Sequence, residues 1–551
     1  MSAITINLTT EGLMASSENS NLARLSVELF DLVLSYIANK DIKCLRLTSR
    51  SIKDVAHLRL DRVFLSPHPR DVQVFQSIAR HETYRKQVFE IIYDDARFSY
   101  GLPSGRWWVR SIWPLTPAME EEWFLKEHEV LEQQFSGFQD YSGRRPDNLE
   151  RSAKFRARIS AEHSFAQYMT ILEEQELGVK SGADADALRE GLARFPRLRR
   201  ITLTPAAHGD RLNPLYETPM IRSLPAGFIC PSPRGWPTRV SYNDHLVVMN
   251  WGVKQTKDNW RGFCLITRVL AEYIEQNLGA PCRIKEFVID TNSLMTGLNC
   301  RIFDPPRRPG YEINRELRDL HILLRQPGFS RLDLALMLCG EGGEKWAVGH
   351  GAPLRQTLSQ AVDLQHVSLT TNADSPDILF DTTPEEQNSK YFVPLRTIFP
   401  LQSWANLRHF GLCRFTVKQS DLLALLAAMP DTLRSVELSF LYFLQLEGSY
   451  REFFEDIRSR LGWRERHVRE RSCIAVAVES MTRDFGSIAV HVDREINAFV
   501  YGEGENPFGA VGVHRNQVFP GIGIERDAFE PAHELYTYHH SVGRHNLIRR
   551  F

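Results

Sequence analysis

The sequence lacks the features that mark secreted, zinc-binding or membrane-spanning proteins. Its 551 residues include only eight cysteines, none of them in a C-x-x-C pair, which argues against a zinc site of the usual spacing. The first twenty residues have neither the basic start nor the apolar core of a secretory signal, so we expect free thiols inside the cell, in the cytoplasm or nucleus. The longest aliphatic run, Leu422 to Met429, is far shorter than the ~20 residues that span a bilayer. We therefore expect no membrane partner.

Charge of one sign is also lacking. The chain has 67 Lys and Arg against 68 Asp and Glu, for a net charge of −1, so it has no overall attraction to nucleic acid. The segment from Arg458 to Arg471 holds six arginines, but Glu465 and Glu470 lie among them. This mixture favours an ion-paired, solvated helix face over a basic patch. We expect no nucleic acid as a partner.

Catalytic motifs are missing as well. The sequence has no P-loop, no G-x-S-x-G, no H-E-x-x-H and no G-x-G-x-x-G after a strand. Cys413, beside Arg414, is the nearest candidate for an activated thiol, but it falls where a strand is expected to end. His539, His540 and His545 have no carboxylate or cysteine placed to complete a metal site. We therefore expect a non-catalytic protein without cofactor or metal.

The most informative stretch of the chain is 25–56. On a helix, residues 27–38 present an apolar arc roughly 220° wide, about twice that of an ordinary surface helix. Two shorter helices are expected to follow, the first carrying Ile42 and Leu45 and the second Ile52 and Val55. A unit this small cannot bury both apolar sides of its first helix. Either the rest of the chain or a partner must cover the spare side.

The same stretch resembles an F-box. The resemblance is carried by Leu25, Glu28-Leu29, the run Leu32 to Ile37 and the run Asp41 to Arg50. F-boxes usually begin Leu-Pro, whereas Ser26 follows Leu25 here; serine is a good N-cap, so the helix start is kept. The continuation 56–98 is similar to the section after the F-box in a large class of filamentous-fungal F-box proteins. The alternative is an ordinary buried core helix.

The resemblance implies binding to the Skp adaptor of a cullin-RING ubiquitin ligase and, through it, to the cullin. We expect the spare side of the first helix to bind the adaptor. The adaptor-binding residues would be Leu25, Leu29, Leu32, Val33 and Tyr36, with Leu45, Leu47 and Arg50 beside them. The opposite side should pack inward through Val27, Phe30, Leu34 and Ile37.

A repeated pattern begins near residue 198: apolar, two free positions, apolar, one free position, apolar. Its instances are Leu198-x-x-Ile201-x-Leu203, Ile284-x-x-Phe287-x-Ile289, Phe329-x-x-Leu332-x-Leu334, Leu364-x-x-Val367-x-Leu369, Leu407-x-x-Phe410-x-Leu412 and Leu433-x-x-Val436-x-Leu438. The last two apolar residues of each alternate as on a half-buried strand, and helical stretches lie between. A strand and a helix per unit is the logic of a leucine-rich repeat. The alternative is an ordinary α/β domain with a parallel sheet.

The free positions between the apolar ones should form one open sheet face, the usual binding face of a solenoid. On this face we select Arg200, His366, His409 and Glu437 as candidates for binding a protein substrate. Mixed charge suits a protein better than nucleic acid. Two alternatives stay open. In one, these are merely solvated strand residues; in the other, the substrate binds the tryptophan-rich segment around Trp107, Trp108 and Trp113 or the C-terminal tail.

These patterns predict an α/β chain with an N-terminal three-helix F-box and an irregular leucine-rich-repeat-like solenoid. We expect a disordered lead at 1–20, the F-box at 21–66, the substrate-recognition region at 67–508 and an irregular tail at 509–551. The segment His491 to Gly509 resembles the closing segment of the same fungal family and should cap the array. The expected function is substrate recognition for an SCF-type ligase; a non-ligase interaction scaffold is the alternative.

Overall fold

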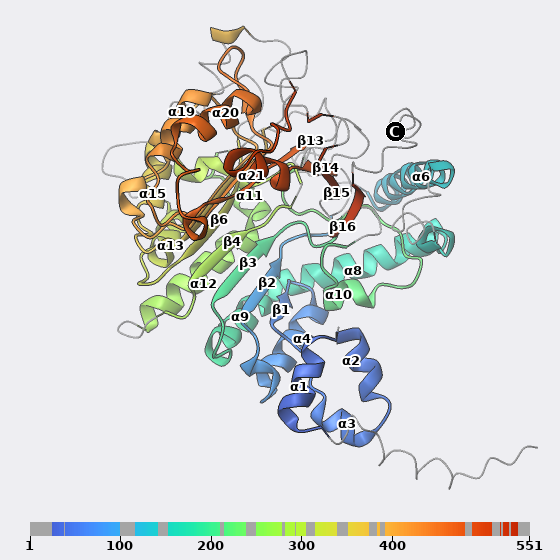
Figure 1. Ribbon diagram of the computed structural model, residues 1–551. Coiled ribbons are helices and arrows are strands. Elements are labelled where there is room, and N and C mark those ends of the chain that lie inside the picture. The colour runs from blue at the N-terminus through green and yellow to red at the C-terminus, as the bar shows by residue number, and fades with distance from the viewer. Residues whose placement is uncertain are drawn as a thin grey trace, which may run out of the picture.

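The computed structural model describes residues 25–37, 39–99, 116–141, 153–209, 214–238, 250–277, 282–292, 294–304, 314–338, 351–373, 383–385, 392–479, 488–509, 518–519, 522–527 and 530–537. Within them, three short helices precede a long parallel sheet, and a small antiparallel sheet lies near the C-terminus (Figure 1). Short 3-10 helices connect some elements: η2 (Tyr84–Lys86), η4 (Cys300–Phe303), η5 (Leu401–Ser403) and η6 (Val468–Glu470).

The three N-terminal helices form a unit with a core of its own. They are α1 (Val27–Ser35), α2 (Asn39–Arg46) and α3 (Arg50–Val55). Ser26 caps α1 by accepting a hydrogen bond from the Leu29 N–H at 3.4 Å, as expected from its position. The core consists of Phe30, Leu34, Ile42, Ile52 and Ala56, and it is separate from the main core of the sheet.

The parallel sheet contains every strand that the repeated pattern predicted. Its strand order is β1-β2-β3-β4-β6-β7-β8-β10-β12, with β5 paired to β6. The strands are β1 (Arg62–Leu65), β2 (Glu90–Asp94), β3 (Arg200–Thr204), β4 (Glu286–Ile289), β5 (Leu298–Asn299), β6 (Arg331–Met337), β7 (His366–Thr371), β8 (His409–Cys413), β10 (Ser435–Ser439) and β12 (Cys473–Ala475). Strand β1 lies within the range expected for the F-box, yet it pairs with β2.

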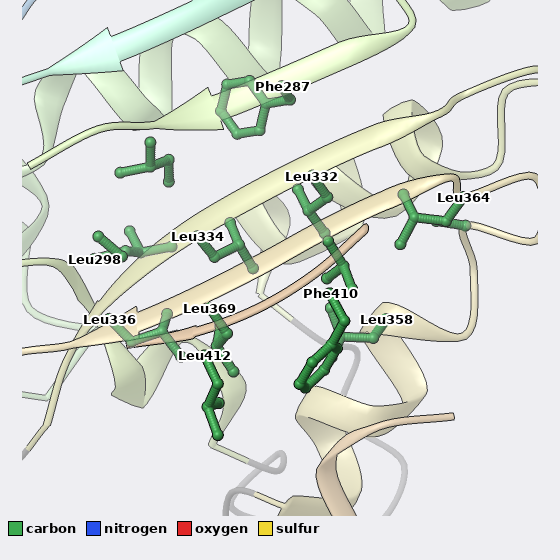
Figure 2. Close-up of a cluster of buried hydrophobic side chains, with 14 of the residues drawn as sticks. Phe287, Leu298, Leu332, Leu334, Leu336, Leu358, Leu364, Leu369, Phe410 and Leu412 are labelled. Carbon is green, nitrogen blue, oxygen red and sulfur yellow. The ribbon is translucent and has the colours of Figure 1, made fainter. Parts of the chain in front are cut away.

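Register follows the repeated pattern from strand to strand. Equivalent apolar residues pair directly: Val63, Ile91, Ile201, Phe287, Leu332, Val367, Phe410, Val436 and Ile474 form one row across the sheet. A second row lies two residues further along, where Leu334, Leu369 and Leu412 meet on neighbouring strands (Figure 2). Both rows point to the same face because side chains alternate along a strand.

Helices cover the face to which these rows point (Figure 1). They are α4 (Pro69–Arg80), α9 (Ala183–Arg194), α12 (Arg261–Gln276), α13 (Arg315–Leu324), α15 (Gly351–Leu358), α18 (Leu395–Ile398), α19 (Gln419–Ala427) and α20 (Tyr450–Arg460). Their apolar sides and both strand rows form one continuous core. One strand and one covering helix per unit is the arrangement expected of a leucine-rich-repeat-like solenoid.

Insertions account for the irregular spacing of the first units. Between β2 and β3 lie α6 (Pro117–Tyr141) and α8 (Ala161–Ser181), and between β3 and β4 lie α10 (Pro219–Ser223) and α11 (Lys254–Asn259). Residues 153–156 are helical, but this helix is interrupted before α8 begins. Ser160 is the N-cap of α8, and the Ile159 N–H is bonded to the Gly227 carbonyl at 3.0 Å, outside any helix.

Helix α21 (Asp493–Tyr501) caps the last strand of the sheet. This helix hydrogen-bonds to alternate backbone residues at β12 through the side chains of Asp493, Asn497 and Tyr501. The Asn497 amide accepts from the Ile474 N–H at 3.1 Å and donates to the Ile474 carbonyl at 2.6 Å. Four residues of helix rise about 6 Å, close to the ~6.6 Å spanned by two strand residues, so the side chains keep step with the backbone. The expected capping segment thus covers the outer edge of β12, whose backbone groups would otherwise be unpaired.

Part of the segment expected to be an irregular tail forms strands instead. An antiparallel sheet joins β13 (Ala477–Glu479), β14 (Ile488–His491), β15 (Ile524–Asp527) and β16 (Glu530–Thr537). The sequence did not reveal β15 and β16 because the pairing of β15 with β14 and of β16 with β15 needs backbone hydrogen bonds and no aliphatic run. A two-stranded parallel sheet, β9 (Thr416–Val417) with β11 (Tyr442–Phe443), follows β8 and β10.

Candidate functional site

The three-helix unit exposes one side of its first helix to solvent. Side chains at Leu29 and Leu32 are each 52% exposed and Tyr36 is 83% exposed, whereas Phe30 and Leu34 are 4% exposed. Leu29, Leu32 and Tyr36 are spaced by three and four residues, which places them along one side of α1 and its C-cap. Leu25, which is 37% exposed, lies directly before the N-cap Ser26. We call these four residues the apolar stripe. Its exposure agrees with the expected outward side of α1.

The other predicted adaptor-binding residues vary in exposure. Leu47 is 87% exposed and Arg50 is exposed, whereas Val33 and Leu45 are half-buried. The prediction that Val27 packs inward was wrong, because this side chain is 65% exposed. Val27 is the first residue of α1, so the described helices that cover the middle of α1 do not reach it.

Polar side chains occupy the outer face of the parallel sheet, opposite the helices. At the start of successive strands, directly paired positions hold Arg62, Glu90, Arg200, Glu286, Arg331, His366, His409 and Ser435. We call this row the polar ladder. Charges alternate in sign along its first five members, and opposite charges on neighbouring strands stabilise a sheet.

One half of the outer face is covered. In the row two residues after the polar ladder, Ile92, Thr202 and Val288 on β2 to β4 are at most 8% exposed. Tyr216 lies across this region: its ring is 5.9 Å from the Phe64 ring on β1, and its hydroxyl donates to Asp290 after β4 at 3.5 Å. The covering segment was not predicted, because a loop that returns across a sheet has no periodic signal.

Arg200, selected as a substrate-binding residue, lies in this covered half. Its guanidinium is paired with Glu286 at 2.6 Å and with Glu90 at 3.9 Å. Both carboxylates are buried, so Arg200 compensates charge within the sheet. The structure therefore separates Arg200 from the other three selected residues.

The open half of the outer face spans β6 to β12 and contains His366, His409 and Glu437, all half-buried. The imidazole rings of His366 and His409 are stacked, with centroids 3.9 Å apart and planes 8° apart. His366 Nε2 is 3.0 Å from Asp333 Oδ1, and His409 Nδ1 is 3.0 Å from Ser435 Oγ. Exact strand register creates this stack, so it could not be found without knowing which residues pair.

Burial and charge set the protonation of this group. Burial, together with the neighbouring His366, lowers the pKa of His409 to about 4. Burial opposes ionisation of Asp333, yet hydrogen bonds from His366 and Arg331 lower its pKa below the ordinary value. At neutral pH His409 is therefore neutral and Asp333 is ionised.

The residues Asp333, His366, His409 and Ser435 include the three residue types of a serine hydrolase, but not its connectivity. A triad needs one imidazole that links the carboxylate to the hydroxyl. Here Asp333 contacts one ring and Ser435 the other, and the rings meet face to face. Stacked faces transfer no proton, so the geometry does not activate Ser435 as a nucleophile.

The remaining sequence candidates can be placed where the structure describes them. Burial raises the pKa of Cys413 to about 12, which disfavours the thiolate that a nucleophile needs. Arg458 and Arg464 pair with Glu503, and Arg460 pairs with Asp456 at 3.0 Å, as expected for an ion-paired segment. Trp107, Trp108, Trp113, His539, His540 and His545 lie outside the described residues.

Two further findings concern the described part of the chain. It contains no group of three or more His, Cys, Asp or Glu side chains arranged to hold a metal ion. None of its helices combines the length and apolar character needed to cross a membrane.

Comparisons with known proteins found a distant structural likeness to a leucine-rich-repeat protein. No family model matches the sequence, and no curated protein matches it. A leucine-rich repeat-containing protein from Legionella pneumophila, LegL7, is similar over 81% of this chain and 99% of its own, at 11% identity and a TM-score of 0.25. A likeness at this score supports no detailed comparison, so the fold is described from its strand register. The chain is an α/β protein whose long parallel sheet, covered by helices on one face, resembles a leucine-rich-repeat solenoid.

Proposed function

We propose that this protein is a substrate-recognition subunit of an SCF-type cullin-RING ubiquitin ligase. The three-helix unit would bind the Skp adaptor as an F-box, and the open half of the outer sheet face would hold a protein substrate. The observation that carries the proposal is the apolar stripe on α1. It coincides with the residues on which the F-box resemblance rests.

Burial energetics support a docking role for the apolar stripe. Completely burying a large apolar side chain stabilises a complex by about 1.5–3 kcal/mol, so four such residues on and directly before α1 can anchor an interface. Exposed apolar residues that gather in one place typically mark interaction surfaces. Because the unit has its own core, a partner can cover the stripe without rearranging the parallel sheet.

An extended sheet with one open face suits binding of a second protein. In the proposed role this chain needs no catalytic residue. It would accelerate ubiquitin transfer by holding the substrate near an enzyme elsewhere in the complex, and proximity alone can lower a barrier substantially.

Copurification with purified adaptor and cullin tests the proposal. The full chain should retain both partners, whereas a non-ligase scaffold would retain at most the adaptor. Leu29→Asp should lose both, because it places a charge in the centre of the docking surface. If the soluble wild-type chain retained neither protein, the ligase assignment would be wrong.

Substrate binding has a separate test. A variant with His366→Ala and His409→Ala should keep the adaptor and lose substrates identified by proximity labelling. Undiminished labelling would remove the open half of the sheet face from the proposal.

A further inference from the structure

Charges in the open half of the outer face are compensated unevenly. Asp333 is paired with both Arg331, at 2.5 Å, and His366, at 3.0 Å. Glu437, on β10, accepts the Ser439 hydroxyl at 3.4 Å, and no described cation forms an ion pair with it. Glu437 is thus the carboxyl group of this surface for which the described chain supplies no positive partner.

The surroundings of Glu437 make this deficit larger. Burial raises the pKa of its carboxyl, and the nearby carboxylates of Asp333 and Asp493 raise it further. The hydrogen bond from Ser439 opposes this shift most, and His366 opposes it less; His366 already contacts Asp333. An external cation at Glu437 would therefore relieve an unfavourable interaction as well as form a new one.

Small residues flank Glu437 on both sides. The residue directly paired with it on β8 is Gly411, and the one on β12 is Ala475. Neither paired residue has a side chain larger than a methyl group, and the side chains of Ser368 and His409 lie over Gly411. The Ser368 hydroxyl lies in the space that a side chain at Gly411 would need, so this side also offers a hydrogen-bonding group.

We propose that the open half of the outer face binds a protein segment that presents a lysine or arginine side chain to Glu437. Charge complementarity selects this occupant, because an acidic segment would add repulsion and a neutral one would leave the carboxyl unpaired. The inference rests on the proposed use of this face for substrate binding, and it adds the chemical class of the substrate segment.

The test uses the full-length chain and an immobilised library of short random peptides. Library members carry either one lysine or arginine, one aspartate or glutamate, or no charged residue. The wild-type chain should retain the basic class about tenfold more strongly than the neutral class, as expected for one charge-assisted hydrogen bond. Glu437→Gln should remove that preference, and Glu437→Lys should shift it to the acidic class.

Glu455→Gln is the matched control. It makes the same change of charge on α20, where Glu455 pairs with Arg451 at 3.1 Å, and it should leave the preference intact. Thermal unfolding should show that all variants are folded. Equal retention of the three classes, retention of none, or a basic preference that survives Glu437→Gln would overturn the inference.

The outcomes separate this inference from the ligase proposal. Adaptor binding with no peptide preference would reject the basic segment alone. A basic preference that depends on Glu437, without adaptor binding, would keep the substrate class and reject the ligase assignment.

Discussion

Adjacent residues on α1 should respond in opposite ways to substitution. Leu29 is 52% exposed, whereas Phe30 is 4% exposed and belongs to a core of five buried residues. Phe30→Ala should destabilise the three-helix unit by about 3–5 kcal/mol, because it removes a buried ring and leaves a cavity. Leu29→Asp should change its stability by less than about 0.5 kcal/mol, as for most surface substitutions.

Both substitutions should weaken adaptor binding, but for different reasons. Loss of Leu29 from a docking interface removes about 2 kcal/mol of apolar burial, and 1.4 kcal/mol corresponds to a tenfold change in affinity. Leu29→Asp should therefore weaken adaptor binding more than tenfold while the unit stays folded. Phe30→Ala should weaken it through unfolding.

Hydrogen exchange of backbone amides in α1 to α3 can measure both effects in the full-length chain, because it reports local unfolding separately from the sheet. Phe30→Ala should lower protection in these helices and leave the amides of β6 to β10 unchanged. Equal loss of protection in Leu29→Asp would refute the division of α1 into an inner and an outer side.

Three further predictions concern the solenoid. Asn497→Ala should leave the outer N–H and carbonyl of Ile474 on β12 without their side-chain partner, at a cost of about 1–3 kcal/mol, and should increase hydrogen exchange in β12. Gly178→Ala should destabilise the chain by about 1–3 kcal/mol in denaturant unfolding, because a Cβ there would lie 1.7 Å from the Pro67 carbonyl oxygen. As a control, the Cβ of Gly182→Ala would meet no atom within 4 Å, so this variant should lose only about 1 kcal/mol through left-handed backbone strain. Burial raises the pKa of Asp94 well above its ordinary value, so this carboxyl lowers the stability of the folded chain once the pH exceeds its pKa in the unfolded chain. In thermal unfolding, Asp94→Asn should therefore match the wild type in acid and be more stable at neutral pH. The gain should be up to about 1.4 kcal/mol for each pH unit between the folded and unfolded pKa values.

The repeat register was predictable because it depends on local spacing. In each unit a residue such as Leu407 fills the turn before the strand, and Phe410 and Leu412 then point to the helix side. This spacing fixes which strand residues face inward whatever the length of the insertions. The inner side of α1 was predictable for the same reason, except at its first residue, Val27.

Contacts between distant segments were not predictable from spacing. The return of Tyr216 across the outer face, which places Arg200 in the covered half, depends on the path of an insertion. The stack of His366 and His409 depends on the pairing of two strands whose stacked residues are 43 positions apart in the sequence. The strands in the expected tail depend on backbone hydrogen bonds of β15 to β14 and of β16 to β15, which leave no mark in side-chain composition.

Affinity for the purified adaptor tests the central claim most directly. Isothermal titration of the full-length chain should show one-to-one binding, more than tenfold weaker affinity for Leu29→Asp, and unchanged affinity for Glu437→Gln. Absence of binding by the folded wild-type chain, or equal affinity of wild type and Leu29→Asp, would contradict the assignment of the apolar stripe as an adaptor-docking surface.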